Sequence, residues 1–185
     1  MGFLQWTAAL ACGYAAGTTI EQCFVRGAFS VGFLTWLEAT GLAEWVRSSN
    51  YGYPSMIGLH AIGMAVMVGL SLVIDMRLVG LFRGIPVHAM NRLFGVAWIG
   101  FGINFVSGSA LFTTQATSYV VDVIFMSKMT LVFIGAISAA ILQPAVAGAG
   151  AWPSGRIPGG TKAIAGLAIV VWIVAIILGR LTAYL

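Results

Sequence analysis

The run from Pro54 to Ile74 contains no Asp, Glu, Lys or Arg, and its one ionisable side chain is His60. At a rise of about 1.5 Å per residue, about twenty apolar residues match the roughly 30 Å hydrocarbon core of a bilayer. We therefore predict a membrane-spanning helix over residues 54–76, closed by the charged residues Asp75 and Arg77. Because a titratable group inside a bilayer is costly and usually functional, the histidine is the first candidate for a site.

Three methionines share a face of this helix with His60. Met56 and Met64 stand four residues before and after the histidine, and Met67 follows three residues later. Residues three and four apart lie on one side of a helix, so the four side chains form a thioether and imidazole stripe. Such a stripe suits an axial ligand of haem iron or a Cu(I) site. Methionine is also an ordinary flexible packing residue, so a stripe that binds nothing is the third interpretation.

The composition excludes several classes of protein. Of the 185 residues, 60% are hydrophobic and 8% are charged, whereas a soluble domain carries about 25% charged residues. We therefore expect an all-α integral membrane protein. The nine Lys and Arg residues are scattered singly, so nucleic acid is not an expected partner. The sequence shows no nucleotide-binding loop and no hydrolytic grouping of Ser, Cys or carboxylates, so an independent enzyme is not expected either.

The first 27 residues form a segment with several possible roles. Residues 2–20 carry no charge but are too polar for a firm span. A marginal span, a signal-like segment and sequence upstream of the natural start are the alternatives. Cys12 and Cys23 match neither a CxxC nor a CxxCH motif, so zinc and c-type haem are not indicated. Residues 28–185 are then expected to form a single transmembrane domain.

An amphipathic helix is predicted over residues 29–47. Trp36 and Trp45 belong to its apolar side, while charged residues such as Glu38 and Arg47 are interspersed. Tryptophans and charges on a short amphipathic helix are typical of a helix that lies at the membrane surface rather than crossing it.

Three further spans are predicted over residues 86–112, 119–142 and 162–182, and Gln143 and Pro144 are expected to end the middle one. The 86–112 span contains glycines that permit close helix approach and polar side chains that need partners within the bundle. These residues are Gly95, Gly100, Gly102, Gly108, Asn104, Ser107 and Ser109. Together with the 54–76 helix, the spans predict a compact up-and-down four-helix bundle preceded by the interfacial helix.

The basic residues predict the orientation of this bundle. Basic residues occur in two loops, 76–86 and 142–162, and at the span ends beside them. The 113–118 loop has none. The basic residues are Arg77, Arg83, Arg92, Arg156 and Lys162. The positive-inside rule places these loops in the cytoplasm. The protein is therefore expected in the inner membrane of a bacterium, with the amphipathic helix and the 113–118 loop on the periplasmic side.

Lys128 is the second ionisable group expected inside the bundle. It lies roughly 13 Å below the start of its span, and His60 lies about 9 Å below the start of its own, so both belong to the outer half. Met126 and Met129 flank the lysine. Facing helices of a bundle are a usual place for a cofactor, and one layer can gather all these side chains. In a haem site Lys128 would pair with a propionate, whereas in a protein without a cofactor it would extend to the surface.

Residues at the inner border form a separate group of candidates. His88 stands close to Arg92 in sequence, one span and a loop away from His60, so the two histidines are not expected to hold one haem. His88 and Arg92 are candidates for contacting a second cofactor or a quinone. Asp75 is expected to pair with one of the arginines at the helix border. An acid beside arginines at this border is also suited to a quinone pocket.

Two stretches resemble known membrane families. An amphipathic helix, an RxS turn, a proline, a histidine and a DxRLxG ending resemble an uncharacterised bacterial membrane-protein family, DUF6644. The matching residues are Trp36, Glu38, Arg47, Ser49, Pro54, His60, Asp75, Arg77, Leu78 and Gly80. The stretch FMSKMTLVFIGAISAAIL is similar to the F-x-x-K helix of CopD-like copper-resistance proteins and of the haem-bearing HemJ family. The resemblance implies a cytochrome b561-like or CopD-like four-helix bundle that holds haem or copper. Related bundles often end this helix with a second histidine where this chain has Ala139 and Ala140, so a bis-histidine haem between these helices is not expected.

Three functions are therefore considered. The first is a b-type haem electron-transfer subunit between quinone and a periplasmic partner, with His60 as ligand. Its further cofactor-contacting candidates are Lys128, Met64, Met129, His88 and Arg92. The second is a Cu(I) transport or resistance protein whose ligands are His60, Met56, Met64 and Met67. The third is a cofactor-free accessory subunit of a larger membrane complex.

Overall fold

The computed structural model describes residues 31–149 and 156–181, which are helical apart from short connections. The elements are a helix over residues 31–38, α3 (Gly41–Ser48), α4 (Gly52–Val79), the 3-10 helix η1 (Val87–Met90), α5 (Asn91–Phe112), α6 (Ala116–Val121), α7 (Val123–Ala147) and α8 (Gly159–Leu181). Four helical segments are long and apolar enough to cross a membrane: α4, η1 with α5, α7, and α8. The expected all-α four-helix membrane bundle is confirmed. The 1–27 segment and its two cysteines lie outside the described residues.

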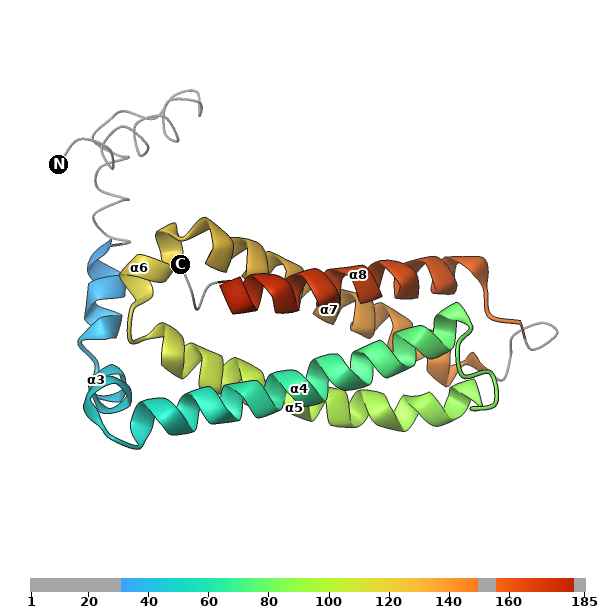
Figure 1. Cartoon of the computed structure of the whole chain (residues 1–185), viewed down its shortest axis with the longest axis horizontal. Helices are drawn as coiled ribbons and strands as arrows, with labels where there is room; N and C mark the ends of the chain where they lie inside the picture. The colour runs from blue at the N-terminus through green and yellow to red at the C-terminus, as the bar shows by residue number, and fades with distance from the viewer. Residues whose placement is uncertain (1–30, 150–155, 182–185) are drawn as a thin grey trace, which may run out of the picture.

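The long helices are arranged as two pairs, α4 with α5 and α7 with α8 (Figure 1). Glycines allow the helices of each pair to approach closely. A Cβ atom added to Gly63 of α4 would lie 2.6 Å from the backbone N of Asn104 and 2.8 Å from the carbonyl O of Gly100. A Cβ added to Gly135 of α7 would lie 2.5 Å from the ring of Trp172 in α8. Such distances are too short for any side chain, so these glycines set the spacing within the pairs.

Apolar side chains join the two pairs in the middle of the bundle and at one end. This end, called the basic end below, carries the 80–86 loop and the connection after α7. Its cluster contains Ile74, Leu78, Met90, Phe94, Leu142, Val146 and Ala165. A second cluster, in the middle, contains Met67, Val68 and Trp172. Among the described residues no such cluster joins the pairs towards the opposite, capped end, where α3 and α6 lie. Figure 1 shows α5 and α7 diverging in that direction.

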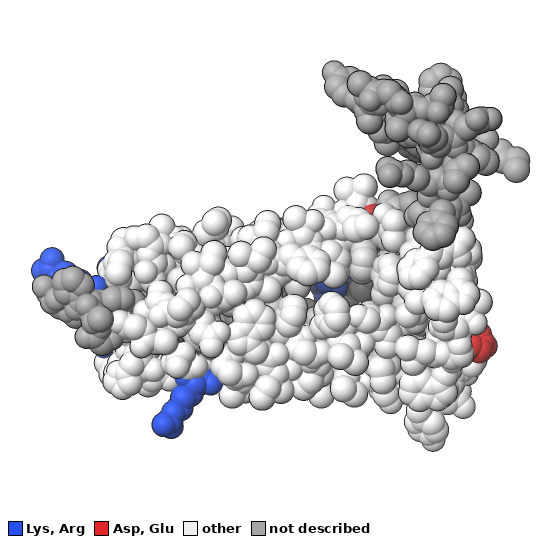
Figure 2. All heavy atoms as spheres, turned by 180° about the vertical axis from the view of Figure 1, so that it is seen from behind, with Lys and Arg blue, Asp and Glu red and all other residues white. Residues whose placement is uncertain are grey.

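The outside of the bundle is apolar along its length. Large exposed hydrophobic side chains are found on every long helix, for example Ile62, Ile99, Ile137 and Ile177. Figure 2 shows the resulting uncharged band, with Lys and Arg gathered mostly at one end. Trp36, Trp45 and Tyr51 are exposed at the capped end, as is typical of aromatic residues at a membrane interface. The chain is thus a multi-pass membrane protein whose surroundings are a lipid bilayer.

The predicted surface helix is interrupted, which corrects the single helix expected over residues 29–47. Helical structure over residues 31–38 ends in a turn, and α3 begins only at Gly41. The cause is Thr40, whose backbone is extended and whose hydroxyl accepts a hydrogen bond from the N–H of Ala43, so it caps a new helix. The interruption lets the two short helices cross the end of the bundle in different directions (Figure 1).

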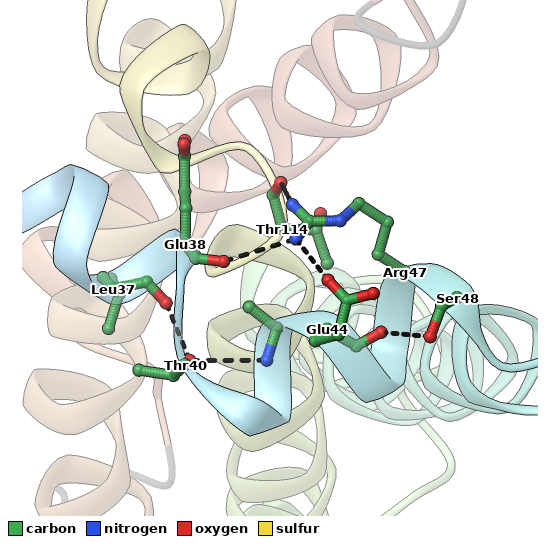
Figure 3. Close-up of polar contacts among 8 residues, drawn as sticks. Leu37, Glu38, Thr40, Glu44, Arg47, Ser48 and Thr114 are labelled. Atoms are coloured by element: carbon green, nitrogen blue, oxygen red, sulfur yellow. Dashed lines mark hydrogen bonds and ion pairs between the residues drawn. The ribbon is translucent and has the colours of Figure 1, made fainter.

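Glu38 and Arg47 attach these short helices to the connection between α5 and α6. One carboxylate oxygen of Glu38 accepts hydrogen bonds from the backbone N and the hydroxyl of Thr117, both at 2.8 Å. Arg47 donates to the carbonyl O of Thr114 at 3.3 Å and to that of Glu38 at 3.4 Å, and forms an ion pair with Glu44 at 2.8 Å (Figure 3). Residues 31–48 and the 113–118 connection therefore form one cap over the end of the bundle.

The attachment of this cap is expected to weaken in acid. The two hydrogen bonds from Thr117 and the charge of Arg47 hold the pKa of the Glu38 carboxyl below its ordinary value of 4.5. A carboxyl whose pKa is lowered on folding stabilises the fold above that ordinary value and loses this contribution as the pH falls through the lowered pKa. Hydrogen exchange of the 113–121 segment should therefore rise in Glu38→Gln at neutral pH, and the difference from the wild type should shrink in acid. Glu44→Gln is the control, and equal exchange in both variants would contradict the role of Glu38.

Two boundaries of the third span differ from the sequence prediction. The predicted start at residue 119 lies in the separate helix α6, because the extended backbone of Asp122 interrupts the helix and its carboxylate accepts a hydrogen bond from the N–H of Ile124. At the other end α7 continues through Pro144 to Ala147. A proline removes one backbone donor, and this close to the helix end the loss is small enough for the helix to continue by one turn.

Candidate functional site

His60 lies about 12 Å along α4 from the capped end and is half-buried against α5. Its Nδ1 lies 3.0 Å from the backbone carbonyl O of Asn104. A carbonyl oxygen only accepts hydrogen bonds, so this contact requires the proton on Nδ1. In the neutral imidazole this contact selects the tautomer that leaves a lone pair on Nε2.

One turn of α5 surrounds the ring. The side-chain amide of Asn104 donates to the backbone carbonyl of His60 at 3.0 Å, so the two residues bond each other in both directions. The hydroxyl of Ser107 lies 3.5 Å from Nδ1 and donates to the carbonyl O of Ile103 at 2.6 Å. Gly108 provides space, because a Cβ atom there would lie 2.8 Å from Cε1 of the imidazole. These contacts fix both the position and the orientation of the ring.

The other ring nitrogen, Nε2, is available to a ligand. No described residue forms a hydrogen bond with it, and the described side chains include no fully buried polar atom that lacks a partner. Nε2 therefore remains accessible. In metal-binding histidines, the nitrogen that does not touch the metal usually donates to a carbonyl or a carboxylate, which orients the ring. His60 has this arrangement within the protein itself.

Lys128 approaches the same layer from the other helix pair. It lies on α7, half-buried, and the end of its side chain packs near Gly179 of α8, where an added Cβ would be 3.5 Å from Cε and 3.8 Å from Nζ. Lys128 is five residues, or about 8 Å, from the start of α7 at the capped end, a depth similar to that of His60 in α4. Figure 2 shows a basic side chain at the bottom of a hollow in the otherwise uncharged face. Within the described ranges Lys128 has no ion pair or hydrogen bond.

The methionines of the predicted stripe have different environments. Met56 and Met64 are half-buried on the same side of α4 as His60. Met67 is 5% exposed and packs with Val68 and Trp172 in the middle cluster, so its side chain serves the core. On α7, Met129 is half-buried and Met126 is exposed.

The second histidine lies at the basic end. His88 belongs to η1 and is exposed, as is Arg92 in the first turn of α5. The structure therefore separates His88 from His60 by most of the bundle, as the spacing along the chain predicts. The expected ion pair of Asp75 is wrong for the described part of the chain, where neither Arg77, Arg83 nor Arg92 pairs with it.

Among the described residues no group of three or more His, Cys, Asp or Glu side chains could hold a metal ion. From the described part of the chain, a ligand set at His60 would therefore include methionine, lysine or a non-protein group. No family model, curated protein or solved structure matches the chain. The resemblance of the sequence to the DUF6644 family therefore remains a prediction, and function must be argued from the site.

The contacts between Asn104, Gly108 and His60 were missed by sequence reasoning, although each residue had been noted by itself. The polar and small residues of the 86–112 span were expected to meet a neighbouring helix, but nothing in their spacing names His60 as the partner. The role of Glu38 and Arg47 in holding the 113–118 connection had no signal in the sequence beyond their charge and their place in the stretch that resembles DUF6644.

Proposed function

We propose that this chain is a b-type haem electron-transfer subunit of a bacterial inner membrane, with Nε2 of His60 as an axial ligand. The observation that carries the proposal is the 3.0 Å bond from Nδ1 to the carbonyl O of Asn104, which orients the ring and, in the neutral imidazole, leaves the lone pair on Nε2.

The remaining side chains of the layer have roles that suit the same ligand. Lys128 supplies a positive charge that can pair with a propionate. Met129 and Lys128 belong to α7 and would be the candidates for a second iron ligand, since methionine with histidine is an established pair of haem ligands. Met64 lies on the same side of α4 as His60 and would contact the haem beside it. A bound haem would supply one-electron redox chemistry. The chain itself would hold the iron ligand in one tautomer and orientation and neutralise the propionate charge.

The two ends of the bundle would exchange electrons with different partners in this proposal. The capped end, about 12 Å from His60 along α4, would face a periplasmic redox partner or a larger membrane complex. His88 and Arg92 at the basic end would contact quinone, because both are exposed at the membrane border and can donate hydrogen bonds to carbonyl oxygens.

An oxidised-minus-reduced absorption spectrum of the detergent-purified protein tests the proposal. We expect a b-type α-band in the wild type and in His88→Ala, and its loss in His60→Ala. The His88 variant is the matched control because it removes the other histidine of the chain. A colourless wild type, or a band that survives in His60→Ala, would overturn the proposal.

A Cu(I) site is the second candidate, because Met56 and Met64 flank His60 on the same half-buried side of α4. Soft thioethers with imidazole suit Cu(I). In this case Met64→Leu should lower the copper content of the purified protein and the copper tolerance of cells that carry it. Met67→Leu should change neither the copper content nor the copper tolerance, since the Met67 side chain packs in the middle cluster.

A further inference from the structure

The D-x-R-L-x-G ending of α4 contains one residue without a visible structural role. Arg77 donates to the carbonyl O of Ile85 at 2.5 Å and to that of Arg83 at 3.4 Å, so it orders the 80–86 loop. Leu78 is fully buried in the basic-end cluster. Gly80 ends the helix with a φ of 124°, a conformation that favours glycine. Packing, loop order and helix termination thus explain every member of the motif except Asp75.

Asp75 is almost completely buried and has no partner among the described residues. Its carboxyl oxygens keep a small contact with solvent, because no fully buried polar atom of the described side chains lacks a partner. Its side chain is 3% exposed, and within residues 31–149 and 156–181 it forms neither a hydrogen bond nor an ion pair. The charged or titratable residues of the basic end are Arg77, Arg83, His88, Arg92, Arg156 and Lys162. In the described structure none of them forms an ion pair with the carboxyl. An isolated carboxylate in such surroundings would carry a large desolvation cost, which a neutral carboxyl avoids.

A second polar side chain that is almost completely buried and lacks a hydrogen bond in the described structure lies one helical turn from Asp75. Ser71 is 5% exposed and forms no hydrogen bond with any described residue. It is four residues before Asp75, so the two share a side of α4. Ser71 also lines a small cavity between the helix pairs, together with Trp98 and apolar side chains. The cavity has a volume of about 10 Å³, and Asp75 is not among the residues that line it.

Asp75 lies near the aqueous boundary on the basic side. The 28 residues of α4 span about 42 Å, whereas the hydrocarbon core is about 30 Å thick. If the helix extends equally on both sides, the last 6 Å or so at the basic end reach beyond the hydrocarbon, and Asp75 stands at that border. Ser71 and the cavity lie on the membrane side of it.

We propose that Asp75 is a proton-binding site at the basic end of the bundle. Its carboxyl holds a proton in the resting protein and releases it to water on that side. The O–H bond of the carboxyl breaks, the proton joins water, and the carboxylate that remains is solvated by water at this boundary. This inference stands on the burial of Asp75, its lack of a partner among the described residues and its position at the aqueous boundary, and it requires no haem at His60.

Infrared spectroscopy of the full chain carrying ¹³C-labelled aspartate tests the proposal. We expect a protonated carboxyl band at neutral pH that shifts after transfer to D₂O and is missing in Asp75→Asn. Asp122→Asn is the matched control, because Asp122 lies outside the long helices and caps α7. This control should leave the protonated band in place. A wild type with carboxylate bands alone, or a protonated band that never exchanges in D₂O, would overturn the proposal.

A measurement on the wild type covers the case in which Asp75→Asn fails to fold. A hydrophobic carbodiimide reacts with protonated carboxyls in apolar surroundings, and mass spectrometry locates the product. Asp75 should be modified, while Glu44 and Asp122 should remain unmodified. Modification of Glu44 or Asp122 in preference to Asp75 would contradict a neutral carboxyl at this position.

Discussion

Replacement of Gly63 by alanine is expected to lower the free energy of unfolding by about 3 kcal/mol, the upper part of the range for overpacked interiors. The added methyl group would lie 2.6 Å from the backbone N of Asn104 and 2.8 Å from the carbonyl O of Gly100. Both atoms belong to the backbone of a helix and cannot rotate away, so α4 and α5 must separate. Unfolding in mixed micelles with increasing denaturing detergent, followed by circular dichroism, measures the change.

The matched control is Gly69→Ala, on the same helix. Gly69 is exposed, and a Cβ there would meet nothing within 4 Å. Because alanine is favoured over glycine in a helix by about 1 kcal/mol, this variant should be as stable as the wild type or more stable. The two substitutions are chemically identical and should act in opposite directions. Equal effects of the two substitutions on stability would show that α4 and α5 are not in close contact at Gly63.

Separation of α4 from α5 should also disturb the candidate site. The reciprocal bonds between His60 and Asn104 join the same two helices one turn from Gly63. In Gly63→Ala these bonds should weaken, and any ligand held by Nε2 of His60 should be bound less tightly. Stability and ligand binding are therefore coupled in this half of the bundle.

The four spans could be predicted from sequence because their signal is simple. A charge-free run long enough to cross a bilayer has few alternatives, since every backbone polar group in lipid must be satisfied within a helix. The interruptions were harder to predict. The breaks at Thr40 and Asp122 depend on single side chains that cap the following helix, and both residue types also occur inside helices. Pro144 was expected to end α7, but its position near the helix end makes its effect small.

At the candidate site, His60 could be predicted from the sequence but its contacts could not, and the physical reason is a different one. His60 stands out because a titratable residue in an apolar run is rare. Its partner Asn104 lies 44 residues away in sequence, and hydropathy does not determine which side of α5 faces α4, because a membrane helix is apolar on all sides. Helix rotation is instead set by the glycines that allow contact, such as Gly63 and Gly100. The bond between His60 and Asn104 can therefore be recognised only once the positions of α4 and α5 relative to each other are known.

Replacement of Gly108 by alanine is expected to displace the ring of His60 without unfolding the bundle. The added methyl group would lie 2.8 Å from Cε1 and 3.0 Å from Nδ1 of the imidazole. Unlike the backbone atoms next to Gly63, these atoms belong to the end of a side chain that can rotate. The ring should therefore swing away and lose its bond to the carbonyl O of Asn104. Loss of this hydrogen bond costs about 1 kcal/mol, so the ring should occupy its hydrogen-bonded position about fivefold less often.

Two readouts separate this effect from a general loss of structure. The imidazole signals of ¹⁵N-labelled histidine should change for His60 and remain unchanged for His88, the only other histidine and one that lies at the basic end. If His60 holds a haem, the α-band should weaken or shift while the melting temperature stays within a few degrees of the wild type. Gly102→Ala, on the same helix with nothing within 4 Å of the added atom, should alter neither readout. An unchanged His60 signal in Gly108→Ala would mean that the ring does not occupy the space beside this glycine, and the axial-ligand geometry would then lose its main support.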